Sequence, residues 1–97
     1  MRHFHRTHIA PDAALAMADE HFAAIGLTRV HADTRRRRYT GALGTLDLSV
    51  KMEGGHYTFV EVATDQVGES RLDKNVKKYF VQLHRQVDPS HAMEAGY

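Results

Sequence analysis

Four consecutive arginines, Arg35–Arg38, are the most unusual chemical feature of the sequence. A planar guanidinium group forms paired hydrogen bonds with phosphate or carboxylate oxygens, and the neighbouring Tyr39 offers a ring on which a base could stack. In a strand, Arg35 and Arg37 would point to one face and Arg36 and Arg38 to the other. Together with basic residues of the last predicted helix, the run forms a candidate anion-binding or nucleic-acid-binding set: Arg35, Arg36, Arg37, Arg38, Lys74, Lys78 and Arg85.

The same charges also have an ordinary structural explanation. Edge strands often carry charge that prevents edge-to-edge pairing, and arginine stems can cover apolar surface. The 12 acidic residues nearly cancel the 13 basic ones, so the net charge is +1. A dedicated nucleic-acid binder normally has a strong basic excess, so a polyanion is the second choice of partner.

The histidines near the N-terminus are the candidate metal ligands. His3 and His5 would point to the same face of a first strand, a spacing that lets two imidazoles share a metal ion. His8 would point the other way, whereas structural zinc normally needs four ligands. The residues that could complete a site through a tertiary contact are Asp12, His31 and His56. We therefore predict no metal and no cofactor, with His3 and His5 as the pair to check.

Tyr57, Phe59 and Glu61 are the candidate interface residues. They alternate with Val60 and Val62 in the strand predicted over 56–64, so they lie on the opposite face from those two valines. Aromatic side chains on an exposed face are typical of interfaces, although a two-sided sheet covered by the first helix or the tail would also explain them. We expect self-association, with a homodimer the commonest symmetric form, or a protein partner.

Catalytic chemistry has the weakest support. The sequence has no cysteine, and Ser49, Ser70 and Ser90 lack the setting of a nucleophile elbow. His56 and Glu61 have the chemistry of a base and an acid, but their spacing does not bring them into one cleft. We expect a binding protein rather than an enzyme.

Length and composition predict a single soluble domain. A chain of 97 residues with 42% hydrophobic and 26% charged residues is ordinary for one globular domain. The N-terminus lacks the apolar stretch of a secretory signal, and no apolar run approaches the length of a membrane span. We predict a cytoplasmic location and no membrane partner.

The pattern predicts two helices and five strands. The first helix covers Pro11 to Ile25 and the last begins between Gly68 and Ser70, ends at Val87 and is capped by Ser70 with Asp73. The strands are predicted over 3–9, 27–32, 35–40, 45–52 and 56–64, with turns at Asp33-Thr34 and Gly54-Gly55. In the fourth strand, Leu46, Leu48, Val50 and Met52 are predicted to face the core. Residues 1–88 form one domain, and 89–97 are predicted to be a flexible tail.

The order is β-α-β-β-β-β-α, an α+β fold in which a curved antiparallel sheet packs against a long C-terminal helix. On the segments Pro11–Ile25, Gly44–Met52 with Gly54-Gly55, and Phe80, the chain resembles the helix-grip architecture. That architecture includes the steroidogenic-regulatory-type lipid-transfer and polyketide-cyclase-like (SRPBCC) superfamily and small bacterial proteins of the same element order. The resemblance implies a pocket for a small apolar ligand, or a cyclase-like activity, between the sheet and the last helix. The chain is smaller than those proteins, and the predicted pocket residues are also its core.

Overall fold

The chain folds as the predicted α+β domain, in a computed structural model that describes residues 1–87. Five strands form one antiparallel sheet in the order β1-β5-β4-β3-β2. The strands and the first helix begin and end within two residues of the predicted bounds. The elements are β1 (Arg2–Thr7), α1 (Pro11–Ala24), β2 (Thr28–Ala32), β3 (Arg36–Gly41), β4 (Gly44–Glu53), β5 (Tyr57–Thr64) and α2 (Arg71–Val87). The predicted tail over 89–97 lies outside the described residues.

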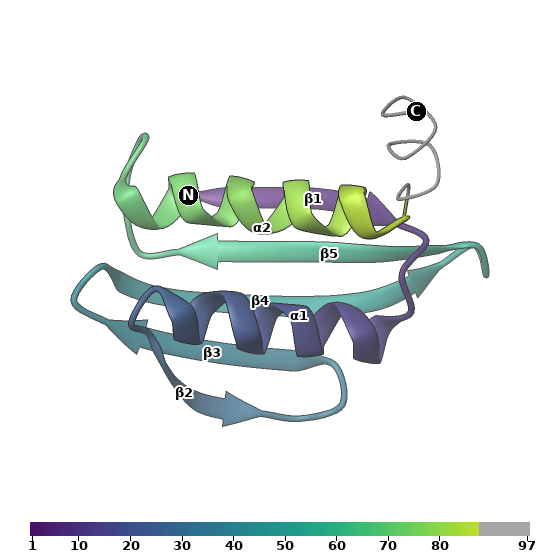
Figure 1. Cartoon of the computed structure of the whole chain (residues 1–97), viewed down its shortest axis with the longest axis horizontal. Helices are drawn as coiled ribbons and strands as arrows, with labels where there is room; N and C mark the ends of the chain where they lie inside the picture. Colours follow the sequence, from purple (N-terminus) through teal and green to yellow (C-terminus); the bar gives the residue numbers. More distant parts are fainter. Residues whose placement is uncertain (88–97) are drawn as a thin grey trace, which may run out of the picture.

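Both helices lie on the same face of the sheet (Figure 1). α2 packs along β1 and β5, and α1 packs beside it along β4, β3 and β2. The space between helices and sheet, where a ligand pocket was one expectation, is occupied by buried side chains. These include Leu15, Ala18, Phe22, Tyr39, Leu46, Leu48, Val50, Val60, Val62, Leu72, Val76, Tyr79 and Leu83. No helix among residues 1–87 covers the other face, which we call the open face.

The prediction for the buried side of β4 is correct for three of its four residues. Leu46, Leu48 and Val50 are buried, whereas Met52 is 47% exposed. Met52 pairs with Thr58 at the hairpin end of the sheet, the last-but-one pair before the Gly54-Gly55 turn. The strand alternation is therefore right, but the core ends before Met52.

The connections use residues suited to each turn. Asp33 accepts hydrogen bonds from the backbone N–H groups of Arg35 (2.9 Å) and Arg36 (2.8 Å), which fixes the predicted β2–β3 turn. Gly44, after the β3–β4 turn, has φ +131°, and a Cβ there would lie 2.6 Å from an Asp65 carboxylate oxygen. Glycine is therefore required at this position.

Asp19 joins α1 to the sheet. Its carboxylate accepts hydrogen bonds from the Tyr39 hydroxyl (2.7 Å), Arg37 Nε (3.0 Å) and Arg29 (3.0 Å). Tyr39 was predicted to be available for stacking on a base, and this is wrong because its ring is buried against Phe22. Burial and the bond to Asp19 raise the pKa of Tyr39, so its hydroxyl stays protonated and donates.

The start of α2 is fixed by the buried carboxylate of Asp73. Ser70 and Asp73 form the predicted cap, with Asp73 N–H donating to Ser70 Oγ (3.0 Å) and Ser70 Oγ donating to the Asp73 carboxylate (2.6 Å). His3 Nε2 (2.7 Å) and Thr64 Oγ1 (2.9 Å) donate to the other carboxylate oxygen. Asp73 therefore links α2 to β1 and β5.

No helix within residues 1–87 is long and apolar enough to cross a membrane.

Candidate functional site

The open face of the sheet carries the predicted interface residues. In β5, Thr58, Val60 and Val62 are buried beneath the helices, whereas Tyr57, Phe59 and Glu61 alternate with them. The predicted outward placement of these three residues is therefore confirmed. Their role at an interface stays a prediction.

An aromatic cluster of Phe4, Tyr57 and Phe59 lies at the hairpin end of this face. Phe4, on the neighbouring strand β1, stacks on Phe59 with ring centroids 5.6 Å apart. Phe4 and Tyr57 are 55% and 42% exposed, values that are high for large apolar side chains. Sequence reasoning missed Phe4, although its alternation with His3 and His5 in the same strand placed it on the opposite face from them.

Two cations lie against the central ring of the cluster. Arg6 Cζ is 4.9 Å and Lys51 Nζ is 5.4 Å from the centroid of Phe59. Both distances are within the range of cation–π attraction. The Phe59 ring on β5 is therefore held by Arg6 of β1 and Lys51 of β4, the two strands that flank β5, and it also stacks on Phe4.

Two ion pairs between strands lie beside the aromatic cluster. Arg6 bonds to Glu53 (2.6 Å), and Arg2 bonds to Glu61. These exposed pairs contribute little to stability in water. They do give the face an alternating pattern of positive and negative charge.

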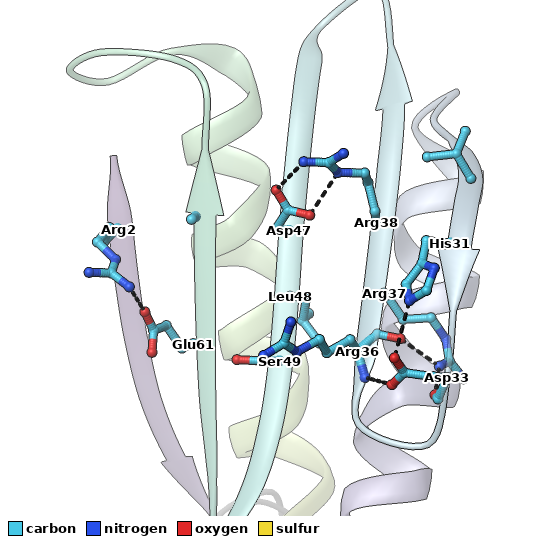
Figure 2. A pocket seen from close by; sticks show the side chains of 12 residues that line it. Arg2, His31, Asp33, Arg36, Arg37, Arg38, Asp47, Leu48, Ser49 and Glu61 are labelled. Carbon is cyan, nitrogen blue, oxygen red and sulfur yellow. Dashed lines mark hydrogen bonds and ion pairs between the residues drawn. The ribbon is translucent and has the colours of Figure 1, made fainter.

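The other end of the open face is hollowed into a groove of about 700 Å³, shown in Figure 2. We call it the arginine groove because Arg2, Arg36, Arg37 and Arg38 all line it. It is an open depression over β3, β4 and β5. The other residues that line it are Val30, His31, Asp33, Asp47, Leu48, Ser49, Glu61 and Ala63.

The structure divides the arginine run between the two faces, as its alternation predicts. Arg37 bonds to Asp19 of α1, whereas Arg38 bonds to Asp47 (2.8 and 3.2 Å) on the open face. Arg36 alternates with Arg37 and so shares the open face with Arg38, while Arg35 precedes β3. The predicted anion-binding set is therefore not one surface. Its α2 members, Lys74, Lys78 and Arg85, lie on the outer side of a helix that packs on the opposite face of the sheet.

His3 and His5 share a face as predicted, beneath α2. The structure engages each of them separately, because His3 bonds to Asp73 and His5 stacks on Phe80 with centroids 5.0 Å apart. His8 lies against Tyr57 at 4.7 Å. Residues 1–87 contain no group of three or more His, Asp or Glu side chains arranged to hold a metal ion.

The candidate acid and base are not brought together. His56 lies in the β4–β5 turn, and Glu61 lies five residues further along, which is about 16 Å in an extended strand. Ser70 caps α2, Ser49 lies in the arginine groove, and Ser90 is outside the described residues. Ser70 and His3 both bond to Asp73, an arrangement in which the carboxylate separates the hydroxyl from the imidazole. A nucleophilic triad instead needs the imidazole between them.

The surroundings of His5 and His21 lower the pKa of both imidazoles and so favour their neutral form. Burial, together with the nearby His84, lowers the pKa of His5. Burial also lowers the pKa of His21, against the opposing effect of its bond to the Asn75 carbonyl (3.0 Å). His21 Nε2 donates to that carbonyl, so Nδ1 is left to accept a hydrogen bond from Gln82 (3.2 Å). Protonation of Nδ1 would remove this acceptor.

We therefore expect the domain to lose stability as the pH falls below about 6.5, the ordinary histidine pKa. In that range the unfolded chain binds protons at His5 and His21 more readily than the folded chain, so protonation favours unfolding. Urea unfolding between pH 7.5 and 5.5 measures this effect. The double variant His5→Gln/His21→Gln should show a flatter dependence, whereas His56→Gln, at an exposed turn position, should leave the slope unchanged. An equal slope in the double variant would contradict the assignment.

No protein-family model matches this chain, and no curated protein matches it either.

Proposed function

We propose that this domain is a binding protein without catalytic activity, and that it acts by self-association through the open face. The observation that carries this proposal is the aromatic cluster, in which Phe4 and Phe59 stack on a sheet face that no described helix covers. Apolar aromatic area that is left in water favours association. The second copy would cover Phe4, Tyr57 and Phe59.

The size of the open face is compatible with a dimer. Five strands about 4.8 Å apart, each about six residues long at about 3.3 Å per residue, span roughly 500 Å² in projection. The relief of the side chains makes the accessible area larger. Stable interfaces typically bury about 800 Å² on each partner, so most of the face would take part.

The charge pattern supports a second copy rather than a strongly charged partner. In a two-fold dimer the same patch meets itself, so a patch of one sign would repel its copy. Here the ion pairs Arg6–Glu53 and Arg2–Glu61 place both signs beside the aromatic cluster. Rotation by a two-fold axis can bring the positive group of one copy to the negative group of the other. Exclusion of water would also strengthen the contacts of Arg6 and Lys51 with Phe59.

We expect Phe59→Asp to convert a dimer into a folded monomer. The introduced carboxylate would be buried at the centre of the interface, and a buried unpaired charge is strongly unfavourable. Native mass spectrometry and sizing at several protein concentrations measure the subunit number, and circular dichroism verifies the fold. The matched control is Val81→Asp, which places the same charge at an exposed apolar residue of α2 and should leave the dimer intact.

Two results would refute this proposal. One is a wild-type protein that remains monomeric at about 100 μM, a concentration well above the dissociation constant of a specific dimer. The other is a dimer that Val81→Asp dissociates and Phe59→Asp does not, which would place the interface on the helical side.

We also propose that the fold is a small helix-grip domain, as its resemblance suggests. Support comes from β1 pairing with the last strand, β5, and from α2 packing across both of them. No ligand pocket is part of this proposal, because the side chains between sheet and helices are themselves the core.

A further inference from the structure

We infer that the arginine groove binds a small organic oxyanion, a carboxylate or phosphate group, at Arg36. The groove and the aromatic cluster occupy different ends of the open face, but a dimer that covers most of this face would also cover the groove, so the inference is tested on the Phe59→Asp variant beside the wild-type protein. Arg36 is the first residue of β3, and its side chain extends over β4 at the middle of the groove (Figure 2).

The ion pairs in the groove identify Arg36 as the available cation. Arg38 is paired with both oxygens of Asp47, and Arg2 is paired with Glu61. Arg37 is bound to Asp19 on the other side of the sheet. Within residues 1–87, the Arg36 guanidinium forms no ion pair or hydrogen bond, although its backbone N–H donates to Asp33.

The acidic groups around Arg36 are already engaged. Both oxygens of Asp47 accept from Arg38, and Asp33 accepts from two backbone N–H groups and contacts His31 at 3.1 Å. Because Asp47 and Asp33 already have partners, they compete less with a ligand for the Arg36 guanidinium, although their negative charges remain. We therefore expect weak binding, with a dissociation constant on the order of a millimolar.

A hydroxyl lies opposite the free guanidinium. Arg36 and Ser49 are direct partners across β3 and β4, and the Arg36 side chain extends over the sheet toward Ser49 (Figure 2). A planar guanidinium binds two oxygens of a carboxylate or phosphate side by side, and a hydroxyl can donate to the same group. The pair therefore provides the donors for one oxyanion.

The walls of the groove indicate what the rest of the ligand is. Ala63 is small, and Val30 is 54% exposed. Val30 is at the irregularity of β2, where the pairing register with β3 shifts between Arg29 and His31. A ligand with one oxyanion and a short apolar body would bind Arg36 and cover Val30. Nucleic acid does not fit, because within the described part of the chain, residues 1–87, the groove offers one free cation and not a row of them.

Nuclear magnetic resonance titration of the wild-type protein and of the Phe59→Asp variant tests this inference. The probes are phenylacetate, phenyl phosphate, inorganic phosphate and the uncharged analogue benzyl alcohol, each added to about 20 mM, well above a millimolar dissociation constant. We expect the two aromatic anions to shift the amide signals of residues 36–38 and 47–49 and the Arg36 Nε signal. The larger of the two responses identifies the oxyanion class, and inorganic phosphate shows whether the apolar body is needed.

Arg36→Gln and Arg35→Gln form a matched pair of variants. Both remove one exposed arginine of the same run, but Arg35 precedes β3 and does not line the groove. We expect Arg36→Gln to weaken binding about tenfold or more, since a charge-assisted pair of hydrogen bonds is lost. Arg35→Gln should bind as the wild type does, and the same spectra show whether each variant is folded.

Three outcomes would overturn the inference. The first is the absence of shifts in both the wild-type protein and the Phe59→Asp variant. The second is an equal weakening in both variants, which would indicate general charge attraction. The third is an equal response to benzyl alcohol, which would indicate an apolar site.

If Arg36→Gln does not fold, Ser49→Ala provides the second variant, and unchanged binding there would also contradict the proposed donor pair.

Discussion

Replacing Asp19 by alanine is expected to lower the free energy of unfolding by about 2–4 kcal/mol, because it removes the shared acceptor of three donors. The change leaves the Tyr39 hydroxyl without its acceptor in the core and Arg37 without its carboxylate. The side chains of Arg37 and Asp19 are only 15% and 27% exposed, so water compensates poorly. Urea unfolding followed by circular dichroism measures the effect.

Asp47→Ala is the matched control. Asp47, on β4, also binds an arginine of β3, Arg38, but the side chains of Asp47 and Arg38 are 54% and 53% exposed. Exposed ion pairs contribute about 0–1 kcal/mol, so this variant should remain close to the wild type. Equal losses in the two variants would show that Asp19 is not a structural link between α1 and the sheet.

Asp73→Ala is expected to lower the free energy of unfolding by about 3 kcal/mol, since a buried acceptor of three side-chain donors is lost, although the backbone N–H of residue 73 can still donate to Ser70. Asp73 is 1% exposed and accepts hydrogen bonds from His3, Thr64 and Ser70. Without it, three donors near the start of α2 lose their partner. Thermal and urea unfolding at pH 7 measure the loss.

Glu69→Ala is the control for Asp73→Ala. Glu69 lies just before the same helix and binds Lys77, but it is exposed, so its removal should leave the stability close to that of the wild type. The pH dependence gives a second check. Burial alone would raise the pKa of Asp73, but the bonds from Ser70, His3 and Thr64 outweigh burial and lower it below 3.8. Its contribution is therefore present above about pH 4 and is lost on further acidification. A wild-type protein as acid-sensitive as Asp73→Ala in that range would contradict this account.

The order of the elements could be predicted because it depends on local patterns. The alternation of Leu46, Leu48 and Val50, the spacing of Ser70 and Asp73, and the Gly54-Gly55 turn each specify structure within a few residues. These patterns also placed Tyr57 and Phe59 on the side of β5 opposite to its buried valines. The helix-grip resemblance stays a prediction.

The contacts that unite the elements could not be predicted in the same way. Asp19 and Tyr39 are twenty positions apart, and their hydrogen bond requires α1 to lie over β3. The basic residues of α2 were grouped with Arg36 and Arg38 because the sequence does not show which face of the sheet a helix covers. The arginine groove likewise results from the shape of three strands together. Such features depend on tertiary arrangement, which neither periodicity nor composition specifies.

The two edges of the sheet oppose ordered aggregation by different means. Within residues 1–87, the sheet ends at β1 on one side and at β2 on the other. Addition of a further chain along β1 would bring together the exposed Arg2 and Arg6 side chains of two copies, and like charges repel. Addition along β2 would meet the irregular register at Val30, which disturbs a continuous ladder. The charge on the β1 edge comes from arginines and is screened by salt, whereas the protection of the β2 edge is geometric and does not depend on ionic strength.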